Sequence, residues 1–306
     1  MSKGRGSKHW NNGLVEWLNH DKMEAYISIA FSWKLPEAYQ RAYWYGLEGY
    51  KVYAGGPATF TNKDYLKGVA KLGGSVNDAI GWHSNGNATI ASRGCPVGCS
   101  WCIVSAMEGK EFTLLPDFTP RNILCDNNVS ALPVEYQLHI IDKYKSSGVD
   151  LLDINSGFEP RSFDEDTYRR WKEIYNGRLV MWRFAYDENK EENEAYRMSQ
   201  ILKNENSRNK RVFVLIGNEP FESCYRRVLQ VIEWGCEPHV QPVYALNTLE
   251  KKHMVKFDWT DQKLKDLARW ANRWMWRSVK FEDYDRFKTV SRKSKKKYTN
   301  GVLWNS

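Results

Sequence analysis

The chain has 306 residues, with 42% hydrophobic and 14% aromatic residues. This composition excludes a disordered or fibrous protein, and the length suits two domains or one large α/β domain with an appendage. The net charge is +8, but seven basic residues follow Asp285 with no acid after them. Without these seven charges the remainder is +1, so the basic character belongs to a tail at 281–306 rather than to a basic domain.

No apolar stretch approaches the roughly 18 residues that a membrane-spanning helix needs. The first ten residues carry basic side chains without the apolar segment of a secretion signal. We therefore expect a cytoplasmic protein with no membrane partner. Three of the six cysteines fall within eight residues, which is typical of metal or redox chemistry in a reducing compartment and not of a secreted disulfide framework.

Residues 1–86 predict a small β-α-β unit that resembles a truncated Rossmann-like domain. Alternating apolar residues indicate a strand at 25–33, an amphipathic stretch that starts near a proline indicates a helix at 35–50, and a second short apolar run lies at 51–59. A crossover of this kind normally joins two parallel strands.

Strand and helix patterns alternate from residue 87 to residue 280. Strands are predicted at 88–92, 149–155, 178–186, 210–216 and 237–245. Helices are predicted between and after them at 133–147, 164–175, 190–204, 221–234 and 260–278. The alternation favours parallel strands covered by helices, in a barrel or in a doubly wound sheet, and the pattern alone does not separate the two.

The cysteine cluster follows the first of these strands, with the spacing C-x3-C-x2-C at Cys95, Cys99 and Cys102. Gly94 and Gly98 allow the backbone to fold tightly. Three thiolates on one short loop suit a [4Fe–4S] cluster whose fourth iron stays open for a ligand. The alternative is a structural zinc site completed by a histidine or a distant cysteine, but zinc sites generally use C-x2-C pairs and the chain has no second pair.

The motif resembles that of the radical S-adenosylmethionine (radical SAM) enzymes, in which an aromatic residue usually precedes the third cysteine, as Trp101 does here. The resemblance implies a partial (β/α)6 TIM-like barrel over residues 87–280. It also implies a [4Fe–4S] cluster on the three cysteines, S-adenosyl-L-methionine as cofactor, and an electron donor such as flavodoxin or ferredoxin. In this family, reductive cleavage of the cofactor gives a 5′-deoxyadenosyl radical that abstracts hydrogen from a substrate carbon.

Two further segments resemble family motifs at the carboxyl ends of strands, where α/β folds place their ligands. Residues 155–160, NSGFEP, resemble the GGEP motif that holds the methionyl amine, with a phenylalanine in place of the second glycine. Residues 214–219, VLIGNE, resemble the strand that flanks the adenine. The cofactor-binding residues implied by these matches, together with Trp101 and the nearby Arg183, are Ser156, Gly157, Phe158, Glu159, Ile216 and Gly217.

Other interpretations of these residues stay open. Glu159 could cap or pair at the strand end, and Arg183 could form an ordinary ion pair instead of holding a carboxylate or phosphate. Cys125, Cys224 and Cys236 are expected to be small buried hydrophobic residues rather than ligands of a second cluster. The segment GGPAT at 55–59 is similar to that of members with a cobalamin-binding domain, but no D-x-H-x-x-G motif is present, so cobalamin is not expected.

The substrate and the catalytic side chains are not indicated by the sequence. A nucleobase in RNA or DNA, a peptide and a small metabolite are all compatible with the family. The basic tail is interleaved with aromatic residues, which favours a nucleic-acid substrate. A different reading of the same features is a non-catalytic, zinc-stabilised nucleic-acid-binding protein, although a body charge of about +1 argues against it.

Overall fold

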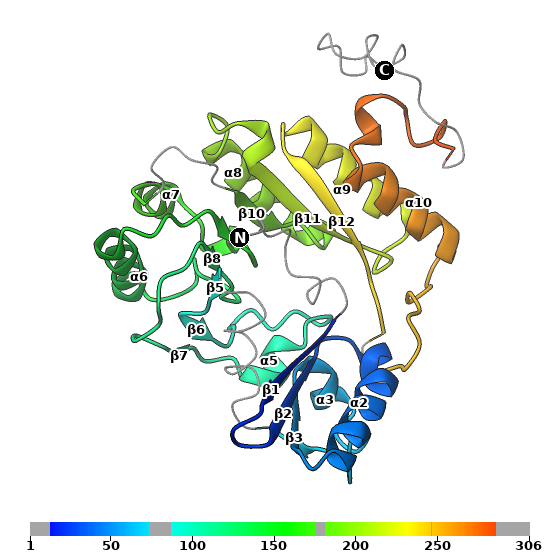
Figure 1. Cartoon of the computed structure of the whole chain (residues 1–306). Helices are drawn as coiled ribbons and strands as arrows, with labels where there is room; N and C mark the ends of the chain where they lie inside the picture. The colour runs from blue at the N-terminus through cyan, green and yellow to red at the C-terminus, as the bar shows by residue number, and fades with distance from the viewer. Residues whose placement is uncertain (1–12, 74–86, 175–180, 246, 286–306) are drawn as a thin grey trace. The chain divides into compact units, whose positions relative to one another are not determined.

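The computed structural model describes residues 13–73, 87–174, 181–245 and 247–285 (Figure 1). The chain divides into two compact units. The first comprises Met1–Asn127, Asp142–Leu151 and Tyr244–Lys252, and the second comprises Asn128–Ile141, Leu152–Val243 and His253–Ser306. The basic residues that follow Asp285 lie outside the described residues, so the prediction for the tail is untested.

The first unit contains a four-stranded sheet with the strand order β1-β2-β3-β4. The strands are β1 (Leu14–Asn19), β2 (Glu24–Ile29), β3 (Lys51–Gly55) and β4 (Lys71–Leu72). Strands β2 and β3 are parallel and are joined through η1 (Ser32–Lys34) and α2 (Leu35–Leu47), which confirms the predicted β-α-β unit. Strand β1, which pairs antiparallel with β2, and the short β4 were not predicted.

The core of this sheet follows from the alternation of β2. Ala25, Ile27 and Ile29 are fully buried, whereas the residues between them are partly exposed. They pack in one cluster with Ala38 and Ala42 of α2, whose small side chains let helix and strand approach closely. Full burial of a residue such as Ile27 stabilises the fold by roughly 1.5–3 kcal/mol. Helix α3 (Pro57–Thr61) follows β3 directly.

The rest of the first unit is built from very short strands. Strand β5 (Ala88–Thr89) is parallel to β8 (Ile123–Leu124), and β6 (Ser92–Arg93) is antiparallel to β7 (Thr113–Leu114), with α5 (Val104–Glu108) between β6 and β7. The strand predicted at 88–92 is therefore two shorter strands. Strand β8 was not predicted. Residues 155–160 therefore follow the third strand of the series β5, β8 and β9 (Asp153–Ile154), and not the second strand as expected.

The second unit has four strands in chain order, namely β9 (Asp153–Ile154), β10 (Trp182–Ala185), β11 (Lys210–Ile216) and β12 (Glu237–Pro242). The pairs β10–β11 and β11–β12 are parallel, and a single parallel bridge joins β9 to the residue before β10. The helices are α7 (Glu165–Lys172), α8 (Glu192–Ile201), α9 (Phe221–Glu233) and α10 (Asp261–Asn272). Helix α6 (Val134–Ser147) is divided, because its residues up to Ile141 belong to this unit and those from Asp142 belong to the first. Short 3-10 turns are η2 (Pro160–Ser162), η3 (Asn189–Glu191), η4 (Ser207–Asn209) and η5 (Met275–Arg277).

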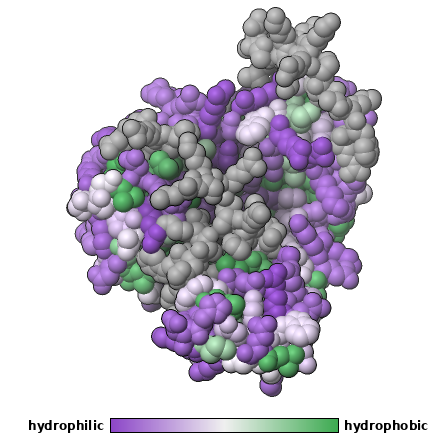
Figure 2. All heavy atoms as spheres, viewed as in Figure 1, coloured by the Kyte–Doolittle hydropathy of each residue, from purple (hydrophilic) through white to green (hydrophobic). Residues whose placement is uncertain are grey.

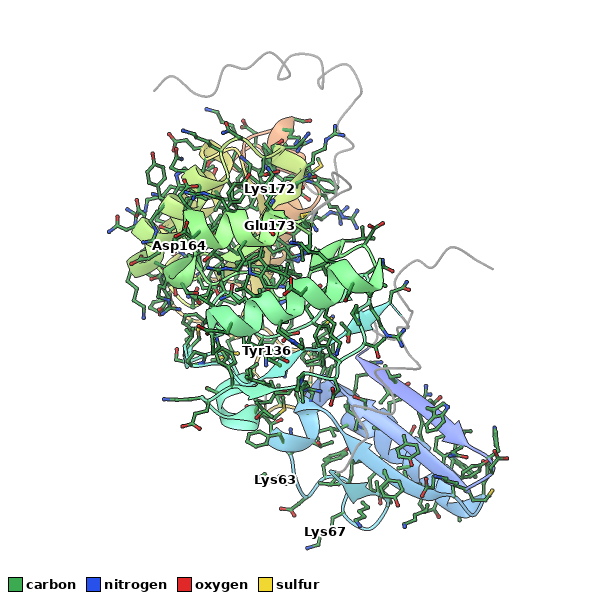
Figure 3. The ribbon with its side chains drawn as sticks, turned by 90° about the vertical axis from the view of Figure 1, so that its left-hand side faces the viewer. Lys63, Lys67, Tyr136, Asp164, Lys172 and Glu173 are labelled. Carbon is green, nitrogen blue, oxygen red and sulfur yellow. The ribbon has the colours of Figure 1, made fainter. Side chains whose placement is uncertain are left out.

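This strand and helix order agrees with the predicted alternation, while closure into a partial (β/α)6 barrel remains a prediction. Helices α9 and α10 lie along the sheet of β10, β11 and β12 (Figure 1). The residues of β11 alternate strictly, with Val212, Val214 and Ile216 fully buried. Asp164 is the N-cap of helix α7, and its carboxylate accepts the Thr167 N–H (Figure 3). The last turn of the helix carries Lys172, so the charges at both ends complement the helix dipole.

The described face in Figure 2 is mostly hydrophilic, with hydrophobic residues in small separate areas. Within the described ranges, no helix is long and apolar enough to cross a membrane.

A buried arginine ties helix α9 to the ends of β10 and β11. Arg227 is 0% exposed, and its Nη1 donates to the carbonyl oxygens of Tyr186 at 2.9 Å and Leu215 at 3.0 Å. Its Nη2 lies 3.2 Å from the carboxylate of Glu219. The adjacent Arg226 is exposed. One guanidinium therefore donates to main-chain carbonyls of two successive strand ends and forms an ion pair with the carboxylate that precedes α9.

Substitution of Arg227 tests this role. We expect Arg227→Met to lower the free energy of unfolding by about 3–5 kcal/mol, because two carbonyls lose their donor and a partly buried carboxylate loses its ion-pair partner. Arg226→Met is the matched control and should change it by less than about 0.5 kcal/mol. Equilibrium urea unfolding measures both, and equal effects would contradict the assignment.

Candidate cofactor site

The three clustered cysteines lie on one loop of the first unit. Strands β6 and β7 pair at its base, and residues 94–112 form the loop between them. Cys95 and Cys99 are partly buried and Cys102 is exposed. The Cys102 N–H donates to the Cys99 carbonyl at 3.0 Å, and the Cys95 N–H donates to the carbonyl of Gly109 at 3.2 Å. The backbone thus fixes both ends of the cysteine segment, and the predicted Trp101 lies partly buried within it.

Glu108 fastens the start of this loop. Its Oε2 accepts the Gly94 N–H at 3.0 Å and the side-chain amide of Asn127 at 2.7 Å, and its Oε1 accepts from Arg93 at 3.0 Å. The side chain is only 12% exposed. Sequence analysis missed Glu108 and Asn127, because only the fold brings the end of α5 beside the residues that follow β8.

Asp126 supports the chain just before the loop. This fully buried carboxylate accepts the Ala91 N–H at 2.8 Å and the Ser92 hydroxyl. Burial raises the pKa of Asp126 to about 6, whereas these hydrogen bonds act in the opposite direction. The junction between β5 and β6 is therefore held by a side chain from the neighbouring strand region.

Gly94 occupies a position that other residues cannot share. Its φ is +88°, and a Cβ atom there would lie 2.2 Å from the carbonyl oxygen of Glu111. Gly98 also has a positive φ of +66°. Both glycines therefore have the backbone freedom that the motif led us to expect.

The donor chemistry of the loop suits an iron–sulfur cluster. It offers three thiols within eight residues, on a loop that is fastened at both ends. Within the described ranges, no three His, Cys, Asp or Glu side chains are grouped so that they could hold a metal ion. Binding of a cluster would thus require the three thiolates to converge on it. Of the other cysteines, Cys224 and Cys236 are buried, as predicted, and Cys125 is partly buried.

The GGEP-like segment belongs to the second unit and follows β9. Gly157 has a φ of +88°, and a Cβ atom there would lie 2.7 Å from the carbonyl oxygen of Arg183. The Phe158 N–H donates to that same carbonyl at 2.7 Å. The close approach of these two chain segments requires a glycine at this position.

The ring of Phe158 points into the core, which restricts its predicted role. It is 3% exposed and packs against Phe163, Trp171 and Trp182, with ring centroids 5.2–5.7 Å apart. Only the main chain of this residue is left to meet a ligand. Ser156, by contrast, is exposed.

Glu159 caps η2 and forms an ion pair with Arg161, which is the alternative to cofactor contact given in the sequence analysis. Its carboxylate accepts from Arg161 Nε at 2.6 Å and Nη2 at 3.1 Å, and it caps η2 by accepting the Arg161 N–H at 3.2 Å. The Glu159 N–H donates to the Ser130 hydroxyl at 2.8 Å. The carboxylate is thus oriented by its own neighbour, and a cofactor contact remains a prediction.

Arg183 forms a two-pronged ion pair with Asp153. Its Nε lies 2.6 Å from Oδ1 and its Nη2 lies 2.7 Å from Oδ2. This is the ion pair considered as an alternative to a ligand contact. Ile216 is fully buried, and Gly217 is so close to the Leu264 side chain that a Cβ atom would lie 3.1 Å from it. Both residues are buried, so an adenosine contact at this strand end remains a prediction.

The face of β10–β12 opposite the buried valines carries polar and aromatic side chains. Arg211 pairs in register with Arg183, and Phe213 pairs with His239. The guanidinium of Arg183 lies 5.7 Å from the Phe213 ring centroid, and the His239 ring meets the edge of Phe213 at 5.5 Å. Sequence analysis missed Arg211 and Phe213, although the alternation of β11 places both on this side.

Asp187 lies just after β10 and is a candidate proton-transfer group. Its Oδ1 accepts the Leu215 N–H at 2.9 Å, and its own N–H donates to Glu191 at 2.8 Å. Burial raises the pKa of Asp187 to about 7, with a further contribution from the Glu191 carboxylate. A carboxyl group that titrates near neutral pH at a strand end is typical of acid–base sites.

The protonation of His239 can be predicted from its surroundings. Burial, and then the charges of Arg211 and Arg183, lower its pKa from 6.5 to about 4, so the ring is neutral at pH 7. The unfolded chain binds this proton at a higher pH, so stability falls as the pH drops from about 6.5 to 4.

We expect the imidazole resonances of His239 in NMR spectra to show no titration between pH 7 and about pH 5. Unfolding of His239→Gln should depend less on pH over the same range than unfolding of the parent chain. A midpoint near 6.5, or identical pH dependence of the two proteins, would contradict the prediction.

Comparison with known proteins adds no further assignment. No known family model matches the chain, and no curated protein sequence matches it. The functional interpretation therefore rests on the cysteine spacing and on the geometry of the two groups of residues described above.

Proposed function

We propose that this protein is a radical SAM enzyme, with Cys95, Cys99 and Cys102 as the ligands of a [4Fe–4S] cluster. The observation that carries the proposal is the C-x3-C-x2-C spacing on a loop that directly follows a strand. The hydrogen bonds of Gly94 and Cys95 support it, because they hold the loop in a defined conformation. The chemistry that such a cluster supplies is one electron for reductive cleavage of S-adenosyl-L-methionine, whose 5′-deoxyadenosyl radical then abstracts a substrate hydrogen.

The chain's own residues have binding and positioning roles in this proposal. In the first unit, the three thiolates are the ligands, and Glu108 and Asp126 position the loop that carries them. In the second unit, the segment from Ser156 to Glu159 provides main-chain groups for the methionyl end, and the buried Ile216 and Gly217 mark the strand end at which the adenosine would bind. Arg183 is held by Asp153, so a carboxylate or phosphate ligand there would share or replace that partner.

The proposed chemistry also indicates the cell compartment, the electron donor and the substrate class. Thiolate ligands require a reducing compartment, so we place the protein in the cytoplasm, with an electron donor such as flavodoxin or ferredoxin. A nucleobase is our first candidate for the substrate class, with a peptide or a small metabolite as the others. The competing function, a zinc-stabilised nucleic-acid-binding protein, predicts zinc in the same loop.

Anaerobic reconstitution with iron and sulfide tests the proposal directly. We expect a brown protein with about four irons per chain that forms 5′-deoxyadenosine from S-adenosyl-L-methionine and a strong reductant. Replacing any one of the three cysteines by alanine should abolish both properties. Cys236→Ala is the control that should keep them, because burial raises the pKa of this thiol to about 11 and leaves it inert. Colourless protein that contains zinc would refute the assignment.

The positioning of the loop is tested by two glycines. We expect Gly94→Ala to lose most of its reconstituted iron, because a Cβ atom would collide with the Glu111 carbonyl and break the Glu108 contact. Gly109→Ala is the matched control, since Gly109 has nearly the same φ of +91° but no atom within 4 Å of the added Cβ.

Iron per chain and the visible spectrum are the measurements, and circular dichroism monitors folding. Glu108→Ala should also lose iron, and Glu108→Gln should retain more of it because an acceptor oxygen remains. Equal iron content in Gly94→Ala and Gly109→Ala would contradict a positioning role for this turn.

A further inference from the structure

The sheet of the first unit carries a row of aromatic side chains on the face opposite its core. Because side chains alternate along a strand, Tyr26 projects to the side opposite Ala25 and Ile27. Trp17 on β1 is the register partner of Tyr26, which is the partner of Tyr53 on β3. We call Trp17, Tyr26 and Tyr53 the aromatic row.

The rings of the aromatic row form two offset stacked pairs. The centroids of Trp17 and Tyr26 are 5.2 Å apart with an interplanar angle of 26°, and those of Tyr26 and Tyr53 are 5.3 Å apart with an angle of 14°. If nearly parallel rings touch at about 3.5 Å, this spacing displaces them sideways by about 4 Å. Such an offset leaves part of the Tyr26 and Tyr53 faces uncovered, in agreement with the partial exposure of these two residues.

Two lysines extend the row at one side. Lys71 on β4 is the register partner of Tyr53, and the ammonium of Lys51 lies 5.3 Å from the Tyr53 ring centroid. Both lysines are exposed. The acid on this face, Glu24, accepts the Tyr26 hydroxyl at 2.6 Å, and this hydrogen bond, followed by burial, raises the pKa of Tyr26 to about 12. The phenol therefore stays neutral. Because Glu24 is also the register partner of Lys51, the formal charges of Lys51, Lys71 and Glu24 sum to +1.

The register row beside the aromatic row carries small side chains. Val15, Ser28 and Gly55 form that row. Lysine is depleted in the cores of protein–protein interfaces, so the exposed Lys51 and Lys71 beside the rings argue against a protein partner. Aromatic faces flanked by ammonium groups are instead the surface that single-stranded nucleic acid requires, because bases stack on the rings and phosphates pair with the lysines.

We propose that this face binds single-stranded nucleic acid, with bases on the aromatic row and phosphates at Lys51 and Lys71. The site is distinct from the cysteine loop and from the basic tail. Binding does not depend on the proposed radical chemistry. If both hold, the substrate class of the enzyme is a single-stranded region of RNA or DNA.

Fluorescence anisotropy with the full chain and labelled single strands of about 12 nucleotides tests the proposal. We expect Tyr53→Leu to bind about tenfold more weakly, and the double variant with Tyr26→Leu to bind more weakly still, because leucine keeps bulk but removes the stacking face. Trp44→Leu is the control, since Trp44 on α2 is 63% exposed and belongs to the helix layer on the core side of the sheet.

The lysines give a readout that does not depend on core packing. Replacing both Lys51 and Lys71 by glutamine should reduce the slope of log affinity against log salt by about 1.4, or about 0.7 per phosphate contact on a single strand, at unchanged circular dichroism. Removal of 286–306 should leave the effect of Tyr53→Leu intact, and a duplex of the same sequence should compete poorly. Failure to bind either single strand, equal binding by the ring variants and Trp44→Leu, or loss of binding with the tail alone would overturn the proposal. None of these measurements uses reconstituted iron. Failure of the nucleic-acid proposal can therefore be distinguished from failure of the enzyme proposal.

Discussion

The conformation of the cysteine loop depends on the buried carboxylate of Asp126. It accepts from Ala91 and Ser92 at the point where the chain leaves β5 and enters β6, and all three residues are 0–1% exposed. A buried N–H or hydroxyl without an acceptor costs about 1–3 kcal/mol, so the chain cannot easily leave this path. The next residue, Asn127, donates to Glu108, which in turn accepts the Gly94 N–H. Two adjacent residues after β8 thus support both the entrance of the loop and the helix that closes it.

In the second unit, charged side chains at the strand ends are paired with groups of the protein itself. Arg183 is engaged by Asp153, Glu159 by Arg161, and Arg227 by carbonyl groups and Glu219. Charged side chains at strand ends are therefore largely neutralised within the protein. A ligand at these strand ends gains most from main-chain groups and from apolar strand ends, because displacing an existing pair would offset the energy of the new one.

The success of sequence-based prediction depended on the length of each element. Strand β11 coincides with the predicted 210–216, and α9 differs from the predicted 221–234 by one residue, because long periodic segments carry their own signal. Strand β8 has two residues and no periodicity, so it was missed. The cysteine motif was visible in the chain, but its supports Glu108 and Asp126 were not, since a polar side chain finds its partner only through the tertiary fold.

The aromatic row shows how local pattern outweighs total charge. The net charge of +8 directs attention to the tail, whereas the body of about +1 gives no reason to expect a nucleic-acid surface. Yet β2 and β3 each place a tyrosine between two buried apolar residues, in AYI at 25–27 and VYA at 52–54. Because alternation sends the flanking residues to the core, the tyrosine between them must lie on the other face. Parallel pairing then aligns the two rings, so a stacking surface is encoded in six residues whose summed charge is zero.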